Sequence, residues 1–231
     1  MYKVFDIFSA IFCFGLIAAY YAEYSAASVI LKTAASVCFV ISGVFGYIVH
    51  RDKKGPALKM LLAFILSAAG DVFLVLDHDR GLLFILGVAS FAAAHVMFLI
   101  VYCGITPINR SDIIATAVVI AGLLAVLLLG DFDYQGLLPL IIGYTVIVSF
   151  MMIKALSLHR SRDGRETAAY LIMAGGVLFL VSDFFLLFVL FARDCPRVVQ
   201  AINLVIYYGA QICLTLAFNR KELYTPDTMK G

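Results

Sequence analysis

Eight long apolar runs, separated by short polar loops, constrain this chain more than any other feature of its sequence. A helix needs about 20 mostly apolar residues to cross a bilayer, because each residue advances it by about 1.5 Å. Hydrophobic residues make up 64% of the 231 residues and charged residues 14%, and a soluble globule of this size cannot bury so much apolar surface. We therefore predict an all-α integral membrane protein, a single polytopic domain over residues 1–231. The predicted spans are residues 4–22, 27–49, 56–76, 82–103, 113–130, 137–158, 166–192 and 198–218.

Lysine and arginine residues predict the orientation of this eight-helix bundle, because they accumulate on cytoplasmic loops. If both termini are cytoplasmic, the cytoplasmic segments carry eleven of these residues and the opposite loops carry three, Arg80, Arg193 and Arg197. We therefore expect both termini in the cytoplasm. The protein would be multi-pass in a bacterial inner membrane, or in an endomembrane if its source is eukaryotic. The net charge of +2 is too small to indicate a nucleic-acid partner.

Two aspartates lie deep within predicted spans, Asp71 in LLAFILSAAGDVFLVL and Asp183 in AGGVLFLVSDFFLLF. An ionisable group at the centre of a bilayer costs about 2.5–3.5 kcal/mol on the most lenient scale, so each needs a reason. Ser67 and Gly70 share a helix face with Asp71, and Ser182 directly precedes Asp183. Small residues of this kind let a neighbouring helix approach closely. Each aspartate is therefore a candidate catalytic residue, with a structural hydrogen bond between helices as the alternative.

Other polar residues fall within the spans. His95 is either a catalytic group or a neutral, hydrogen-bonded core residue, and the sequence leaves both readings open. Lys32, near the start of the second span, could extend to the membrane interface, pair with an aspartate or hold a phosphate. For the phosphate role, Arg80 in the following outer loop is a weaker candidate. The last span carries a stripe at helical spacing, Gln200, Asn203, Tyr207 and Gln211, which must face the bundle interior or a wet cavity.

A weak internal repeat accompanies these residues. GDVFLVL in the third span and SDFFLLF in the seventh are 112 residues apart, about half of the chain, in spans of the same orientation. A duplication of four helices would place Asp71 and Asp183 in equivalent positions. We therefore predict a possible 4+4 arrangement.

The order and spacing of five motifs resemble the YhhN-like membrane proteins, whose characterised members are lysoplasmalogenases. The motifs are Lys32 in the second span, S-x-x-G-D at Ser67 to Asp71, G-x-x-x-F-x-x-x-H at Gly87 to His95, F-x-x-S-D at Phe179 to Asp183 and Y-Y-x-x-Q at Tyr207 to Gln211. No single motif is specific, but their order across five spans is. The resemblance extends from the second span to the eighth.

This resemblance implies hydrolysis of the vinyl-ether bond of a lysoplasmalogen to a fatty aldehyde and a glycerophospho-alcohol. Water and the lysophospholipid would be the reactants, among membrane lipids, with no cofactor or metal. Asp71 and Asp183 carry over as the catalytic residues. The residues expected to bind substrate or support the site are Lys32, Ser67, His95, Ser182, Asn203, Tyr207, Tyr208 and Gln211.

The chemistry of vinyl ethers suits two carboxyl groups independently of the resemblance. Their hydrolysis begins with protonation of a carbon and passes through an oxocarbenium ion that water captures. One carboxylic acid can donate the proton while an ionised carboxylate stabilises the cation, as in glycosidases. Which of Asp71 and Asp183 takes which role cannot be read from the sequence.

Two other functions compete with this hypothesis. A small transporter or proton-coupled carrier would also use intramembrane aspartates, and the half-chain repeat favours it slightly. A zinc hydrolase would need ligands from His95, Asp71 and Asp183, because the other histidines lie outside the spans. The five cysteines show no CxxC spacing and indicate neither disulfides nor a metal site.

Overall fold

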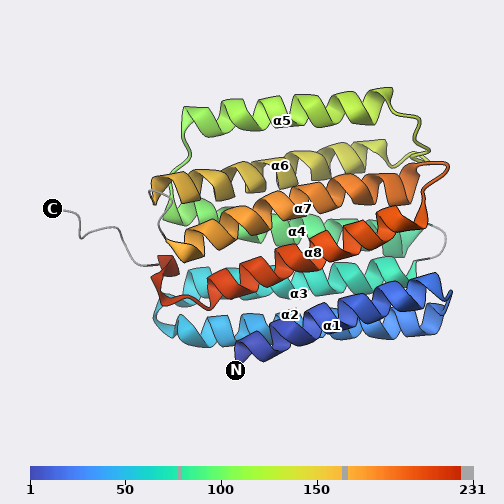
Figure 1. The fold of residues 1–231 in the computed structure, drawn as a ribbon. Coiled ribbons are helices and arrows are strands. Elements are labelled where there is room, and N and C mark those ends of the chain that lie inside the picture. Colours follow the sequence, from blue (N-terminus) through green and yellow to red (C-terminus); the bar gives the residue numbers. More distant parts are fainter. Residues whose placement is uncertain (78–79, 163–165, 225–231) are drawn as a thin grey trace.

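The computed structural model describes residues 1–77, 80–162 and 166–224, and these residues form an all-helical bundle (Figure 1). Its eight long helices are each long and apolar enough to cross a membrane, which confirms the predicted fold class. Their bounds differ from the predicted spans by at most three residues. The helices are α1 (Tyr2–Tyr21), α2 (Ser25–Val49), α3 (Lys54–Leu76), α4 (Leu82–Ile105), α5 (Arg110–Leu129), α6 (Leu138–Ser161), α7 (Thr167–Phe191) and α8 (Arg197–Phe218), with short 3-10 helices at Arg51–Lys53 and Lys221–Tyr224.

The helices run alternately up and down, so the N-terminus and the last described residue, Tyr224, lie at the same end (Figure 1). We call this the terminal end, and the other the opposite end. Consecutive helices α1 to α4 pack side by side, as do α5 to α8. Contacts of α8 with α1 and α2, and of α4 with α6, join these two groups into one bundle.

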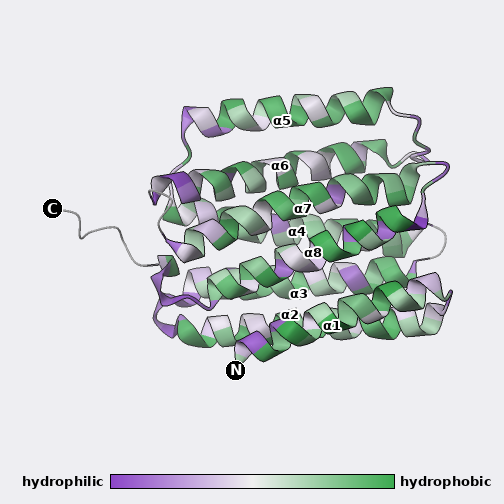
Figure 2. Ribbon diagram, in the orientation of Figure 1, coloured by the Kyte–Doolittle hydropathy of each residue, from purple (hydrophilic) through white to green (hydrophobic). Residues whose placement is uncertain are grey.

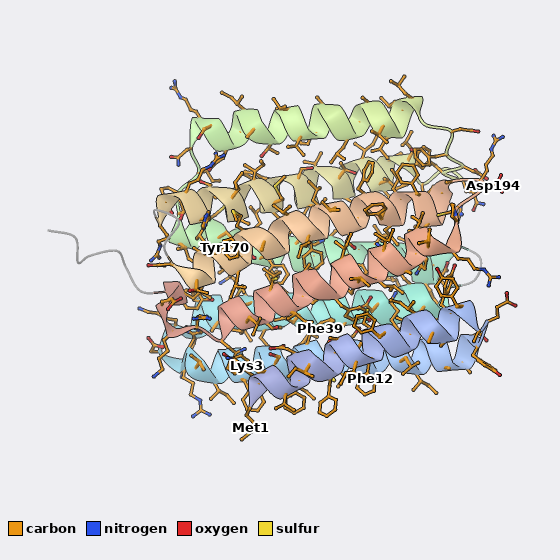
Figure 3. All side chains as sticks on the ribbon, in the orientation of Figure 1. Met1, Lys3, Phe12, Phe39, Tyr170 and Asp194 are labelled. Atoms are coloured by element: carbon orange, nitrogen blue, oxygen red, sulfur yellow. The ribbon has the colours of Figure 1, made fainter. Side chains whose placement is uncertain are left out.

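Apolar residues cover the helices along their length, and hydrophilic residues concentrate at the two ends (Figure 2). Large apolar side chains such as Phe14, Ile113 and Val118 are exposed, as expected of surfaces that face lipid. Side chains fill the space between the ribbons, where Phe39 is fully buried (Figure 3). The polar groups discussed below therefore lie within a packed interior, away from the lipid-facing surface.

Helix α5 is the least buried of the eight. Only 17% of its most apolar window is buried, against 56% for α8. It packs mainly on α6 and forms the edge of the bundle (Figure 1). Its terminal end is anchored by Lys154 of α6, whose fully buried ammonium group donates to Asp112 Oδ2 and to the carbonyl oxygen of Pro107, both at 3.0 Å. This ion pair fixes α5 at the terminal end.

Replacing Lys154 by Met should destabilise the protein strongly, because it leaves the Asp112 carboxylate buried without its cation. Breaking a buried pair by removing one partner costs about 3–5 kcal/mol. The double variant Lys154→Met/Asp112→Asn should recover part of this loss. Thermal unfolding of the purified protein in detergent checks both expectations. A Lys154→Met protein as stable as the parent would contradict this role of the pair.

Candidate active site

Asp71 is the centre of a closed polar cluster formed by α2, α3 and α8. Its Oδ2 accepts hydrogen bonds from Ser36 at 2.6 Å and from Tyr207 at 2.7 Å, and Lys32 Nζ lies 3.4 Å from its Oδ1. Asp71 is only 2% exposed. Two hydroxyl donors and a cation therefore compensate a negative charge that would otherwise be buried among apolar helices.

The local sequence explains why α3 and α4 meet closely beside this cluster. Gly70 directly precedes Asp71, and a Cβ atom there would lie 2.7 Å from the ring of Phe91. Any larger residue would push the two helices apart or displace this ring. Ser67, on the same face of α3, is fully buried, and its hydroxyl has no hydrogen-bond partner among the described residues.

Three of the four residues of the polar stripe of α8 face the interior, as predicted, while Gln200 at its start is half-buried. Asn203, Tyr207 and Gln211 are all buried, and Gln211 Nε2 donates to the hydroxyl oxygen of Tyr207 at 3.1 Å. Tyr208 donates to the carbonyl oxygen of Lys32 at 3.2 Å, which ties α8 to α2. The stripe therefore positions the hydroxyl group that binds Asp71.

Asp183 is the centre of a second cluster, formed by α4, α6 and α7. Tyr144 donates to Asp183 Oδ2 at 2.9 Å, and His95 Nε2 lies 2.9 Å from the Tyr144 oxygen and 3.7 Å from Asp183 Oδ2. Since the one hydroxyl proton of Tyr144 is directed at Asp183, its oxygen accepts from His95, which places a proton on Nε2. His95 Nδ1 is buried without a partner among the described residues.

Asp183 differs from Asp71 in that it lines an apolar cavity. The cavity, about 80 Å³ in volume, lies in the opposite half of the bundle between α4, α5, α6 and α7. Among its lining residues are Asp183, Tyr144, Phe91, Leu127 and Phe191. Ligand sites typically combine apolar walls with a few polar groups. Asp183 and Tyr144 therefore present hydrogen-bonding groups to an apolar space.

Ser182 and Asn203 connect the helices that carry the two clusters. Asn203 Nδ2 donates to the carbonyl oxygen of Ser182 at 2.7 Å and to its hydroxyl at 3.0 Å. These bonds fix α7 against α8 directly beside Asp183. The two residues act on the arrangement of the helices, and neither lines the cavity.

The described residues form no hydrogen bond or ion pair that joins the two aspartates. Aromatic rings lie between the clusters: the Tyr207 ring centroid is 5.9 Å from that of Phe91 and 5.7 Å from that of Phe179, and His95 lies 4.9 Å from Phe179. The residues predicted from the sequence are thus brought together as two clusters that share an aromatic boundary.

A shift of 112 residues relates the two clusters. It carries Lys32 to Tyr144, Asp71 to Asp183 and His95 to Tyr207. In each cluster the preceding helix supplies one of the related residues, Lys32 or Tyr144, and the last helix of the other half supplies the other. Among the described residues, Ser36 of α2 is a further contact that only Asp71 has. The helix contacts agree, because α2 packs on α8 as α4 packs on α6. This correspondence supports the predicted 4+4 repeat.

Sequence reasoning missed two residues of the site, Tyr144 and Ser36. Tyr144 lies 112 residues after Lys32, so applying the repeat to every polar residue would have found it. Ser36 lies one helical turn after Lys32, on the face that meets Asp71. Among the described residues no three histidine, cysteine or acidic side chains are placed to hold a metal ion, so the zinc alternative has no ligand set there.

Comparison with known proteins assigns the chain to a family. The sequence model described as the YhhN family matches residues 10–218. The chain belongs to the YhhN family. A curated relative, lysoplasmalogenase TMEM86B of Sus scrofa, is 27% identical over 179 residues, which cover 75% of this chain and 69% of the relative. No solved structure matches the chain. The family and this relative support a lysoplasmalogenase-like hydrolase that is a multi-pass membrane protein of lipid metabolism.

Replacing Lys32 by Met in this YhhN protein should lower its thermal stability more than the double change Lys32→Met/Asp71→Asn. The single change leaves a buried carboxylate without its cation, at a cost of about 3–5 kcal/mol. Unfolding midpoints in detergent measure the difference, with Lys59→Met, outside the cluster, as the control. If Lys32→Met kept full stability and only raised KM for a phosphate-bearing substrate, Lys32 would instead be a substrate ligand.

Proposed function

We propose that this YhhN protein hydrolyses the vinyl-ether bond of lysoplasmalogens, releasing a fatty aldehyde and a glycerophospho-alcohol. The observation that carries the proposal is the position of Asp183, a carboxyl group on the wall of an apolar cavity that is hydrogen-bonded to Tyr144, which in turn contacts His95. Vinyl ethers react by proton transfer to carbon, so the acid must reach an apolar part of the substrate. An acid that lines an apolar space within the membrane meets that need.

In the proposed mechanism Asp183 donates its proton to the vinyl carbon distal to the ether oxygen. An ionised Asp183 would have no lysine or arginine partner among the described residues. We therefore take the protonated, neutral acid as the form that begins the reaction. The C=C electron pair forms the new C–H bond, and an oxocarbenium ion results. Water adds to this ion and returns a proton to Asp183. The hemiacetal then breaks into the aldehyde and the alcohol.

Tyr144 and His95 have a positioning role in this scheme. The Tyr144 hydroxyl binds one carboxyl oxygen of Asp183 and leaves the other for the substrate. His95 binds the Tyr144 oxygen, and the Phe179 ring packs edge-on against the imidazole. Pre-organised donors of this kind keep the acid within hydrogen-bonding reach of the reacting atom.

Asp71 is the second proposed catalytic carboxyl group, and its cluster assigns it the ionised form. Lys32 supplies the cation, while Ser36 and Tyr207 supply two hydrogen bonds. Its negative charge would stabilise the cationic intermediate across the aromatic boundary. Tyr207, which binds Asp71, packs against Phe91 on the cavity wall, so this ring separates the charge from the cavity. The two aspartates thus divide the roles that the vinyl-ether reaction needs.

A proton-coupled carrier is the alternative that the repeated clusters favour, because internal repeats with intramembrane carboxyl groups are common in transporters. Both functions need Asp183. They differ in whether the substrate is changed, so an assay for released aldehyde separates them.

Purified protein in detergent should release aldehyde from a lysoplasmalogen, and Asp183→Asn should lower the rate by about 10²–10⁴-fold, the usual contribution of a general acid. Asp71→Asn should also lose activity, with an added loss of stability because Lys32 is left unpaired. The control is Asp131→Asn, in an exposed pair with Arg193. A saturated alkyl lysophospholipid should not react. Near-normal turnover by a folded Asp183→Asn variant would refute the mechanism.

A further inference from the structure

Arg80 contacts two residues that line the opposite-end part of the cavity beside Asp183. Its guanidinium carbon lies 5.1 Å from the ring centroid of Phe191, and Nη2 donates to the carbonyl oxygen of Leu190. Both residues line the cavity. Nη1 donates to the carbonyl oxygen of Asp133 at 3.1 Å. Two carbonyl oxygens and an aromatic ring therefore fix the guanidinium group at the cavity edge.

The backbone at Arg80 is held in an unusual conformation that directs the side chain there. Its φ of +52° lies in the left-handed region, which non-glycine residues rarely adopt. Asp77 holds the backbone at Arg80, because its Oδ2 accepts from the Arg80 amide at 2.9 Å and its Oδ1 accepts from the Phe84 amide at 3.2 Å. Phe84 also lines the cavity, so Asp77 connects Arg80 to the cavity wall.

The charge of Arg80 has no acidic partner within the part of the chain that the structure describes. The other two arginines of this end are paired, Arg193 with Asp131 and Arg197 with Glu23. The hydrogen bonds to the carbonyl oxygens of Asp133 and Leu190 use two of the five guanidinium N–H donors. Arg80 therefore retains both positive charge and hydrogen-bond donors for an anionic ligand.

The spacing of Leu190 and Asp183 along α7 fits a lysoplasmalogen. Leu190, which Arg80 contacts, lies seven residues beyond Asp183, or about 10 Å along α7. In the substrate seven covalent bonds separate the phosphorus from the vinyl carbon that takes the proton, a reach of roughly 8 Å when extended. An ion pair at one end and a proton transfer at the other can therefore form together.

We propose that Arg80 binds the phosphate of the lysophospholipid while the vinyl ether lies against Asp183. This inference rests on the proposed function and names the residue that selects its substrate. Lys32, which the sequence favoured for the phosphate, is held in the Asp71 cluster and does not line the cavity. The headgroup then lies at the opposite end of the bundle, and the lipid binds from the leaflet at that end.

The test measures binding of a non-hydrolysable alkyl lysophospholipid and of the matching alkylglycerol, which lacks the phosphate. Arg80→Met should weaken binding of the phospholipid by about 10- to 100-fold, the usual effect of losing charged hydrogen bonds, and leave alkylglycerol binding unchanged. Arg80→Lys should restore part of the loss. Arg193→Met, a paired arginine of the same end, is the control and should bind both ligands normally.

An equal loss of both ligands in Arg80→Met, or an equal effect of Arg193→Met, would overturn the proposal. Because neither ligand can be hydrolysed, the result is independent of the proposed activity. Selective loss of the phospholipid in a protein that releases no aldehyde would refute the hydrolase and leave the phosphate site standing. Normal hydrolysis with an unchanged KM in Arg80→Met would refute the phosphate site alone.

Discussion

The cost of an unpaired charge inside a membrane is the constraint on which the rest of this structure depends. Hydrocarbon offers no water to solvate a carboxylate, so each buried aspartate must be neutral or compensated. Asp71 is compensated by Lys32 and two hydroxyl donors, and Asp112 by Lys154. Asp183 has only neutral partners, Tyr144 and His95, and an apolar cavity beside it. The same residue type thus occupies chemically different positions, and this difference is what the proposed division of roles requires.

The repeat gives this difference a structural origin. Asp71 and Asp183 lie on equivalent helices, but their partners differ. Where the Asp71 cluster has a lysine the Asp183 cluster has a tyrosine, and where the first has a tyrosine the second has a histidine. The surrounding helices differ as well. Helix α1 packs closely on α2 and α8, whereas its counterpart α5 packs mainly on α6 and leaves the cavity between itself, α4 and α7. One half of the bundle therefore closes around its aspartate, and the other leaves an apolar cavity beside it.

How well the sequence predicts each structural feature depends on the kind of interaction that creates that feature. Transfer of apolar residues into hydrocarbon defines the spans, and it depends on composition alone, so their ends were predicted within three residues. The inward orientation of the α8 stripe follows from the same argument. The partners of Asp183 do not, because Tyr144 lies 39 residues away and meets it only through the packing of α6 on α7. The cavity depends on how side chains fill the space beside α5, which no local pattern in the sequence encodes. The pairing of Lys32 with Asp71 was one of three alternatives, and the structure selects it.

The central claim is that the two aspartates occupy different settings, Asp183 open to an apolar cavity as a neutral acid and Asp71 enclosed as a compensated carboxylate. Dicyclohexylcarbodiimide, an apolar reagent that couples to protonated carboxyl groups, tests this claim directly. After treatment of the purified protein, peptide mass spectrometry locates the modified residues, with Asp183→Asn as the control. The account predicts modification of Asp183 and none of Asp71. Modification of Asp71 in a folded protein whose Asp183 stays unmodified would contradict it.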